Sequence, residues 1–593
     1  MSSAKKSKSA PAIRTIVQLV LKNDTGDSFY RMRWPAQELA RQDGTLRVIN
    51  LSAEAKERKD WALSADLLVL FQSQDLDLLP IIEERRKLGR RTLVEYNDNF
   101  YEPAPWSPVA EAWSSPLLWQ TYETILNASD GLIVTGPGLA ELFASRTAIP
   151  IHVLPNYYPR DLPPFAQHPA KPGTEINVGW AGSLGHMADI LSFAPNIGRL
   201  IADFPQSNLH LMGNETLPSL VHVPKDRLRF KPWGSMDQYF EFWLPIHIGI
   251  VPLLDTPYNR GRSDIKAVEI AASGALPILP DTLIYRDFIA ATGVPTYRSL
   301  DEAEEILRSF MANPEKVRTA AERAYTYVRD RRLQSADSER LRLYSSMFPS
   351  TEPASASWPV GVGAHELDGT PELETETTRV LKSVQKQWNE KQRQEALAEI
   401  RSASERSPSN IEWSIAALRL TAAARDAAFP TLLQSHVTRF PRDLRAFLLA
   451  ISVAEVQSRL ELWKRVLQRL ASDARSRDFF RAEVVRLALL DLVRVPGFDQ
   501  VLPALGQLYP TSPEIHLALG ELLERQGRFE QSLAHFDWLL RAMMLHEQGK
   551  TFFSSVDQGY IKAWGATLRA RLRSNEPLDS SKGAVQAATK QSP

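Results

Sequence analysis

Short apolar runs alternate with amphipathic stretches along the first part of the chain. Apolar residues recur at helical spacing over 34–41, 77–88, 119–128 and 137–145, which predicts a helix in each range. The apolar runs between these ranges have the length of buried strands, and they read TIVQLVL, RVINL, DLLVLF, RTLVEY and GLIVT. Strands that alternate with helices indicate a parallel, doubly wound α/β sheet. We therefore expect a first α/β domain over residues 13–160.

The same alternation resumes after a proline-rich stretch, 159–173, which predicts an interdomain linker. The second series of apolar runs begins with INVGW and includes strand-like segments at 209–212 and 245–253. A helical run over 300–332 ends the series. We expect a second α/β domain over residues 174–348. Two such domains joined by a linker form a cleft, which is a common place for a ligand.

The pattern changes after the second α/β domain. Residues 350–377 are rich in Ser, Pro, Thr and Glu, which predicts a second linker. Residues 380–574 are helical almost throughout, and Pro408, Pro441 and Pro510 recur at spacings close to one and two repeats of ~34 residues. The last unit, SPEIHLALGELLERQGRFEQSLAHFDWLL, looks like a tetratricopeptide repeat. Such arrays present a concave binding face; an unspecific helical bundle is the alternative.

Composition narrows the class of protein. The chain carries 70 basic and 70 acidic residues and no net charge, which argues against a bulk nucleic-acid binder. It has no cysteine, which excludes disulfides and thiolate chemistry. No apolar run approaches the ~20 residues of a membrane span. The ends, 1–12 and 575–593, are expected to be disordered tails. We expect a cytoplasmic protein without a transmembrane segment; a peripheral position at the inner membrane stays open.

One stretch, NRGRSDIKAVEIAASGALPILPD at 259–281, organises the candidate site. Ser263 is a good N-cap, and Gly274 is placed to end the helix that follows. Three cations crowd the start of this helix, although cations there oppose the helix dipole by roughly 0.3–1 kcal/mol each: Arg260, Arg262 and Lys266. An anion would relieve that cost, because helix N-termini bind phosphate through free N–H groups.

Glu269 lies three residues after Lys266, so both side chains project from one face of the helix. A cation near the cap with a carboxylate one turn further in could hold a nucleotide, with the phosphates on the first and a ribose diol on the second. The alternative is a surface Lys266–Glu269 pair beside a basic loop.

Three loops of the first domain follow predicted strands, where ligands bind in open α/β sheets: 22–33, 97–106 and 135–139. Asp98 could act as a base or orient a hydroxyl, and the alternative is an Asx turn. For Arg31 and Arg33 the alternative is a solvated surface. The candidates on this acceptor side are Gly26, Tyr30, Arg31, Arg33, Asn97 and Asp98.

The second domain has a small-residue loop of its own, AGSLGHMAD, directly after its first strand. Gly182 and Ser183 permit a close backbone approach to a phosphate. His186 and Asp189 either face the cleft or cap and solvate the helix that follows.

Residues 15–332 resemble the glycosyltransferases of the GT-B fold, in particular the retaining group 1 (family 4-like) class. The resemblance rests on YRMRWPAQELA, EYNDNFYEP, VGWAGS, FKPWGSMDQYFEF, IGIVPL and SDIKAVEIAASGALPIL, in that order. It implies two Rossmann-like domains, which the tetratricopeptide-like helical region follows. The last motif is the most specific, because in that family it binds the donor nucleotide.

The resemblance assigns roles to particular residues. It makes Glu269 a ribose ligand and, with Asp98, a candidate catalytic residue. The same resemblance implies that Lys266 and Arg262 contact the diphosphate of the donor. It also implies that the segment 231–234 lies near the nucleobase. The complete set of donor-side candidates is Gly182, Ser183, Lys231, Trp233, Arg260, Arg262, Lys266 and Glu269.

The sequence departs from the family pattern in two places. The family often has a first glutamate eight residues before the second, and here that position is Gly261. The usual Arg and Lys that clamp the diphosphate are absent from WAGSLGHMAD. Arg260, Arg262 and Lys266 could supply that charge instead.

The resemblance implies transfer of a sugar from a UDP- or GDP-sugar, with retention at the anomeric carbon and without a metal or cofactor. The acceptor would be a protein, such as a flagellin or an adhesin, or a surface polysaccharide that the helical repeats recruit. A degenerate transferase domain that only binds, in a scaffold assembled through the repeats, is the alternative.

Overall fold

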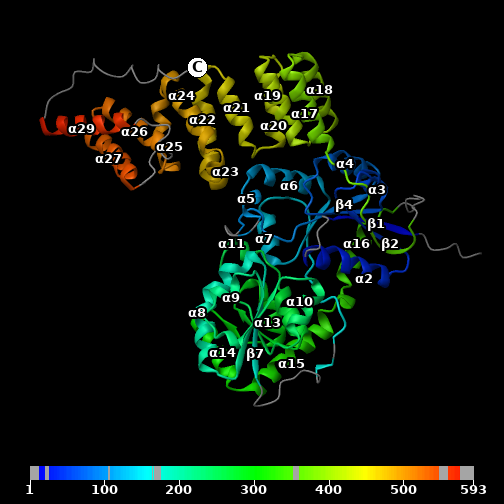
Figure 1. Ribbon diagram of the computed structural model, residues 1–593. Coiled ribbons are helices and arrows are strands. Elements are labelled where there is room, and N and C mark those ends of the chain that lie inside the picture. Colours follow the sequence, from blue (N-terminus) through cyan, green and yellow to red (C-terminus); the bar gives the residue numbers. More distant parts are fainter. Residues whose placement is uncertain are drawn as a thin grey trace, which may run out of the picture. The chain divides into compact units, whose positions relative to one another are not determined.

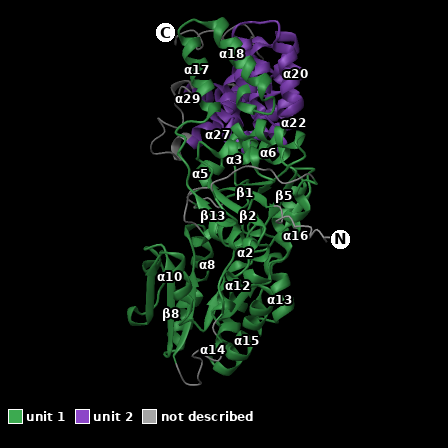
Figure 2. Cartoon of the chain, turned by 90° about the vertical axis from the view of Figure 1, so that its right-hand side faces the viewer, with its two compact units in different colours: residues 1–413 green, residues 414–593 purple. Residues whose placement is uncertain are grey.

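The structure is a computed structural model that describes residues 13–20, 26–103, 107, 109–162, 164–165, 175–350, 360–545 and 558–574. The chain forms two compact units, residues 1–413 and 414–593, which Figure 1 traces along the sequence and Figure 2 colours separately. The expected tails, 1–12 and 575–593, lie outside the described residues, as does most of the expected linker 159–173.

The first α/β domain is built on a seven-stranded sheet in which all described strand pairs are parallel. In sheet order the strands are β13 (Gly363–Leu367), β2 (Leu46–Ser52), β1 (Arg14–Val20), β3 (Leu67–Phe71), β4 (Arg91–Glu95), β5 (Gly131–Val134) and β6 (Ile151–Val153). The helices between them include α2 (Trp34–Gln42), α3 (Arg58–Ser64), α4 (Leu79–Lys87), α6 (Pro116–Ala128) and α7 (Pro137–Ala144). The predicted doubly wound architecture is confirmed.

The second α/β domain has a six-stranded sheet, and its described strand pairs are also parallel. In sheet order the strands are β12 (Thr296–Tyr297), β11 (Leu276–Pro280), β10 (Ile248–Ile250), β7 (Ile176–Ala181), β8 (Ser207–Gly213) and β9 (Leu228–Pro232). Its helices include α8 (Met187–Asp203), α10 (Met236–Trp243), α11 (Pro257–Arg260), α12 (Ile265–Ala272), α13 (Arg286–Thr292), α14 (Leu300–Met311) and α15 (Pro314–Arg331).

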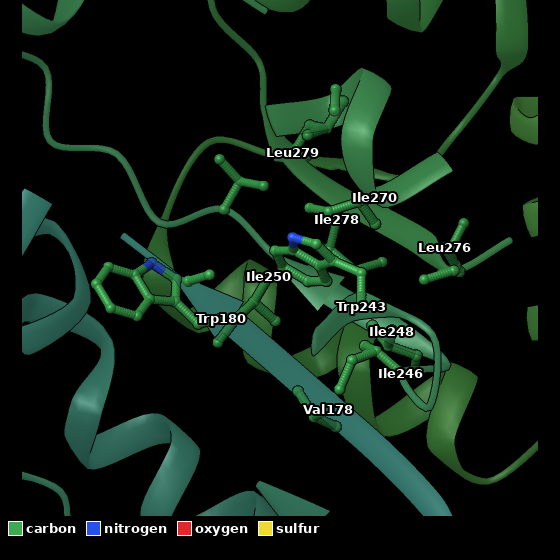
Figure 3. Packing of buried hydrophobic residues seen from close by; sticks show 14 of the residues in the cluster. Val178, Trp180, Trp243, Ile246, Ile248, Ile250, Ile270, Leu276, Ile278 and Leu279 are labelled. Atoms are coloured by element: carbon green, nitrogen blue, oxygen red, sulfur yellow. The ribbon is translucent and has the colours of Figure 1, made fainter. Parts of the chain in front are cut away.

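A single apolar core holds the second sheet to its helices. Figure 3 shows Trp180 and Trp243 beside the branched aliphatic residues of β10 and β11, and both indoles are almost fully buried. Ile270 of α12 belongs to the same core, with no exposed surface. The apolar face of α12 is therefore fixed, and its polar residues are left on the side of the cleft.

Residues 360–377, the described part of the expected linker 350–377, belong to the first α/β domain and the start of the first paired helix, so for them the prediction is wrong. Residues 363–367 form β13, which pairs in parallel with β2 at the edge of the first sheet. The Asn50 amide donates to Glu366 at 2.6 Å, and Asp77 accepts from the backbone N–H of Thr377 at 2.8 Å. An edge strand has one neighbour and half-exposed side chains, so its sequence lacks the apolar signature of a central strand.

The predicted limits of the second domain, 174–348, also need correction. Its last segment forms α16 (Glu339–Met347), which packs on the core of the first sheet. Tyr344 is fully buried there, and Arg340 pairs with Glu95 at 3.1 Å. The chain therefore returns to the first domain before β13 begins.

Paired helices follow. Unit 1 ends with α17 (Glu376–Asn389), α18 (Arg393–Arg406) and the first residues of α19 (Ile411–Ala423). Unit 2 includes α20 (Phe429–Arg439), α21 (Leu444–Val453), α22 (Val456–Ser472), α23 (Ala474–Phe479), α24 (Arg481–Arg494), α25 (Leu502–Leu508), α26 (Pro513–Arg525), α27 (Phe529–Leu545) and α29 (Gln558–Ser574). Within the described ranges, every helix is too short or too polar to span a bilayer.

The last predicted repeat is confirmed as a helix-turn-helix unit made of α26 and α27. Gly520 lets the helices meet, because a Cβ there would lie 2.7 Å from the Phe536 ring. Ser532 donates to the Gly520 carbonyl at 2.7 Å. Gly527 turns the chain between the helices at a φ of 76°, a left-handed conformation that glycine adopts without strain.

A glycine in α7 controls how closely the first α/β domain meets the segment that carries the cations. A Cβ at Gly138 would lie 1.9 Å from the backbone carbonyl oxygen of Arg260. We expect Gly138→Ala to cost about 1–3 kcal/mol in the free energy of unfolding, because backbone must move. Urea denaturation measures this, with Gly44→Ala as control since nothing lies within 4 Å of a Cβ there. Equal midpoints for both variants would contradict the expectation.

Candidate functional site

A cavity of about 580 Å³ lies at the carboxyl ends of strands from both sheets of unit 1. Parallel α/β sheets bind ligands at this edge. The loops after β1, β4 and β5 line one side of it, and the loops after β7 and β10, with α10 and α12, line the other. The candidates that the structure brings together here are Gly26, Tyr30, Arg31, Asn97, Asp98, Gly182, Ser183, Trp233, Arg262, Lys266 and Glu269.

Three candidates lie outside this cavity. Arg260 is exposed and pairs with Asp255 at 2.7 Å. Arg33 lies 3.5 Å from Glu366 of the first sheet's edge strand. Lys231 is exposed on β9. All three belong to predicted site motifs, but they are not among the residues that line the cavity.

The start of α12 supplies the positive charge of the site. Lys266 Nζ donates to the Ala181 carbonyl at 3.1 Å and lies 5.3 Å from the centre of the Trp180 ring. A Cβ at Gly185 would lie 3.1 Å from Arg262 Nη2. The two cations therefore lie against the small-residue loop that follows β7, which has no Arg or Lys of its own. Burial lowers the pKa of Lys266 to about 8, although Asp189 opposes the shift.

The cap of α12 differs from the prediction. The N-cap position is Asp264, and its side chain makes no capping hydrogen bond. Asp264 instead pairs with Arg332 at 2.6 Å, while Ser263 Oγ accepts a hydrogen bond from the Asn156 amide at 3.0 Å. Ser263 as the N-cap is therefore wrong. The first N–H groups of α12 lack a side-chain cap, which suits an anion at this end of the helix.

Two carboxylates of the first domain face Arg262. Asp98 lies 3.5 Å from Arg262 Nη1, and burial raises the pKa of Asp98 to about 7 despite that cation. Burial also raises the pKa of Asp27, which Arg262 and the Asn97 side chain oppose. The sequence reasoning missed Asp27, although it follows β1 as Asp98 follows β4. A carboxyl that titrates near neutral pH is suited to proton transfer.

Arg31 touches the cavity, but its guanidinium is already engaged. It pairs with the buried carboxylate of Glu95 and donates to the Leu154 carbonyl at 2.8 Å and to Asn156 at 2.7 Å. The side chain is 1% exposed, and burial lowers its pKa. Arg31 therefore fixes the short helical segment Phe29–Arg33 to the first sheet.

Glu269 sits one turn into α12 and is 4% exposed. The Tyr30 hydroxyl donates to Oε1 and the Tyr239 hydroxyl donates to Oε2, each at 2.6 Å. Burial raises the pKa of Glu269 to about 7, and these two hydrogen bonds oppose the shift. The carboxylate thus accepts one hydroxyl on each oxygen, which is also how a carboxylate would hold a ribose diol. Tyr239, on α10, was missed by the sequence reasoning.

A side chain at Gly261, the position of the family's first glutamate, would lie tight against its neighbours. A Cβ at Gly261 would lie 3.0 Å from Leu139 Cδ2 and 3.1 Å from Asn99 Cβ. Gly261 lines a different cavity, of about 760 Å³, together with Asp255 and Arg260. Gly261 is not among the residues that line the cavity of Lys266.

No family model matches this sequence, and no curated protein matches it. Solved structures with a similar fold include a sucrose-phosphate synthase from Thermosynechococcus elongatus, at 14% identity and a TM-score of 0.42, over 56% of this chain and 99% of that one. A Thermobaculum terrenum O-GlcNAc transferase mutant matches at 14% identity and a TM-score of 0.38, over 57% and 68%.

The pneumococcal O-GlcNAc transferase GtfA in complex with UDP and GlcNAc matches at 14% identity and a TM-score of 0.35, over 49% of this chain and 58% of that one. These neighbours are glycosyltransferases of the GT-B fold. At these values the likeness concerns the fold, and the function has to be argued from the residues of the cavity.

Proposed function

We propose that this protein transfers a glycosyl group from a nucleotide-sugar to an acceptor. One observation carries the proposal: Lys266 and Arg262 lie against the loop of Gly182 and Ser183, with Glu269 one helical turn further into the same cavity. The diphosphate would lie beside the cations, and a ribose diol would replace the two tyrosine hydroxyls at the carboxylate. The volume, about 580 Å³, is within the range of small-molecule sites.

The chemistry follows from the charges. When the bond between the anomeric carbon and the diphosphate oxygen breaks, negative charge develops on that oxygen and an oxocarbenium ion develops on the sugar. Lys266, Arg262 and the uncapped N-terminus of α12 would stabilise the leaving diphosphate, so the proposal needs no metal ion. Asp98 faces the cavity from the first domain and would accept the proton of the acceptor hydroxyl. We propose a retaining reaction, in which the acceptor oxygen forms its bond to the anomeric carbon on the face that the diphosphate leaves.

The donor and acceptor classes are part of the proposal. The donor would be a UDP- or GDP-sugar, with its base near Trp233, which is 53% exposed at the cavity rim. The acceptor would be a protein, such as a flagellin or an adhesin, or a surface polysaccharide. The paired helices would recruit it, because stacked helical pairs present extended binding surfaces. We propose a cytoplasmic location.

A thermal-shift screen tests the donor site directly. We expect one of UDP, GDP, ADP or CMP to raise the melting temperature of the wild-type protein, since a ligand at a hundred times its dissociation constant stabilises by about 2.7 kcal/mol. Arg260→Ala, which removes a cation outside the cavity, should keep the shift, while Lys266→Ala should lose it. A wild-type protein that no nucleotide stabilises would contradict the proposal.

Two observations favour the second candidate function, a scaffold in which the transferase fold only binds. Gly261 stands where the family often has its first glutamate, and the hydroxyls of Tyr30 and Tyr239 already occupy both oxygens of Glu269. A protein that binds a nucleotide but transfers no sugar to any offered acceptor would support it. Release of free sugar from a nucleotide-sugar would exclude it.

A further inference from the structure

His186 lies at the cation end of the cavity, in the loop between β7 and α8, and Asp189 holds its ring. His186 Nδ1 lies 3.0 Å from Asp189 Oδ2. The other oxygen, Oδ1, accepts hydrogen bonds from the backbone N–H of Leu254 and from the Asn259 amide, both at 2.9 Å. Asp189 is 1% exposed. These two donors stabilise the ionised form of the carboxylate, although burial raises the pKa of Asp189. In its ionised form the carboxylate accepts the third hydrogen bond as well, and the proton of that bond is then on His186 Nδ1.

The second ring nitrogen of His186 faces the ligand space. A neutral imidazole has one donor nitrogen and one acceptor nitrogen, so a proton on Nδ1 leaves a lone pair on Nε2. The ring lines the cavity, and within the described part of the chain no hydrogen bond reaches Nε2. His186 caps α8 by position only, because its side chain makes no capping hydrogen bond. The two interpretations that the sequence left open are both met in part: His186 lines the cavity and also stands at the N-cap position of α8, while Asp189 lies in the first turn of α8 and is not among the residues that line the cavity.

The charges around His186 decide its state in the empty cavity. Burial, together with the positive charges of Lys266 and Arg262, holds the pKa of His186 well below its usual value of 6.5. Asp189 faces Nδ1, while Asp98 and Asp27 face Arg262 from the first domain. His186 is therefore neutral at neutral pH, and a phosphate oxygen opposite its Nε2 would meet a lone pair.

An anion changes this balance. A diphosphate beside Lys266 and Arg262 would offset their positive charges, and its oxygens would favour a proton on Nε2. We propose that His186 is a third diphosphate-binding group, which takes up a proton from solvent as the nucleotide binds and then donates a hydrogen bond from Nε2. Asp189 balances the charge of the imidazolium and fixes the ring. This inference rests on the proposed function, because its ligand is a nucleoside diphosphate.

The role differs from that of Lys266, which is largely charged before the ligand arrives. His186 acquires its charge only with the ligand, so binding and proton uptake are linked. The affinity for the diphosphate should fall as the pH rises through the pKa that His186 has in the complex, since above it the proton is no longer taken up.

Isothermal titration calorimetry with UDP tests the proposal, at pH 7 in buffers of different ionisation enthalpy. The dependence of the observed heat on the buffer gives the number of protons taken up. We expect the wild-type protein to take up roughly half to one proton more than His186→Gln. The glutamine variant keeps an N–H donor near the position of Nε2 but cannot titrate, so its UDP affinity should stay within about fivefold of wild type. His186→Ala should lose about tenfold or more.

Matched measurements separate His186 from other titrating groups. Lys266, Glu269 and Asp98 remain in every variant, so their contributions largely cancel in the difference. His222→Gln removes an exposed histidine outside the cavity, and it should keep the wild-type proton uptake. Uridine, which has no phosphate, should show no uptake that depends on His186.

Three outcomes would overturn the proposal alone: equal proton uptake by the wild type and His186→Gln, unchanged UDP affinity in a folded His186→Ala protein, or uptake with uridine that depends on His186. A wild-type protein that binds none of the nucleoside diphosphates would overturn the proposed function as well, so the two failures are distinguishable.

Discussion

Replacement of Lys266 by alanine is expected to lower kcat/KM for glycosyl transfer by about 100- to 1,000-fold, the usual effect of removing one preorganised group that stabilises a developing negative charge. Lys266 is held for this role before any ligand binds, since its Nζ donates to the Ala181 carbonyl and lies beside the Trp180 ring. Burial disfavours the charged form of the ammonium group, because it removes the group from water. The pKa of Lys266 is therefore lowered to about 8.

The dependence of kcat/KM on pH also reports whether Lys266 must be charged. A lysine that must be charged loses its function as the pH rises through its pKa, so kcat/KM of the wild-type enzyme should fall above about pH 8. Steady-state kinetics with the nucleotide-sugar found in the screen measure both effects.

Arg260→Ala is the matched control for Lys266→Ala. Arg260 is also a cation of the 259–266 segment, but it is exposed, pairs with Asp255 and lies outside the cavity. Its removal should change kcat/KM by less than about threefold, since exposed ion pairs contribute little. If the two variants lost activity equally, the cavity would not be the donor site. A Lys266→Ala enzyme within threefold of wild type would remove Lys266 from the mechanism.

Glu269→Gln is expected to stabilise the protein above neutral pH while it abolishes most of the transfer. Burial raises the folded-state pKa of Glu269 from 4.5 to about 7. The folded protein therefore holds a proton that the unfolded chain releases between about pH 4.5 and pH 7, and stability falls as the pH rises through that window. Above it, the ionised carboxylate lowers the free energy of unfolding by on the order of 3 kcal/mol.

Glutamine has the shape of the carboxylate without its charge. Its amide can accept from one phenol and donate to the other, so Tyr30 and Tyr239 keep partners. We expect the variant and the wild type to unfold at similar urea concentrations at pH 5, and the variant to be more stable at pH 8. Transfer should fall by about 100-fold, because the amide offers one acceptor to a ribose diol where the carboxylate offers two.

Glu304→Gln provides a control variant in which the expected change in stability at pH 8 has the opposite sign. Glu304 binds Arg308 and Arg199, and these contacts lower its pKa to about 2. A carboxylate with a lowered pKa stabilises the fold above its unfolded pKa, so its replacement should weaken the protein at pH 8 and have no effect on transfer. A Glu269→Gln protein that unfolds more easily than wild type at pH 8 would show that the two tyrosine hydrogen bonds outweigh the cost of burial.

Local periodicity was sufficient for much of the candidate site. Lys266 and Glu269 stand three residues apart on a helix, and that spacing alone puts them on one face. The strand before each loop was visible as an apolar run, and parallel strands bring their carboxyl ends to one edge. The sequence therefore predicted the α/β architecture and the helix that carries the site.

Local spacing could not show which cations of the 259–266 segment line the cavity and which are exposed to solvent. Arg260 and Arg262 are two residues apart and chemically identical, yet one is in solvent and the other faces Asp98. The difference depends on where α11 ends and α12 begins. Similarly, β13 has too few apolar residues to identify itself, and it is a strand because the edge of β2 offers unpaired backbone groups.

What the sequence determined by itself is the alternation of the apolar strands with helices and the shared face of Lys266 and Glu269, since these depend on neighbours within a few residues. Only the tertiary structure decided the partners of those groups. Tyr30 reaches Glu269 across 239 positions of the chain, and Lys266 covers a loop 85 positions earlier. The first contact forms when the two predicted domains close on each other, and the second forms when α12 packs beside β7 within the second domain. No local pattern records which side chains will meet.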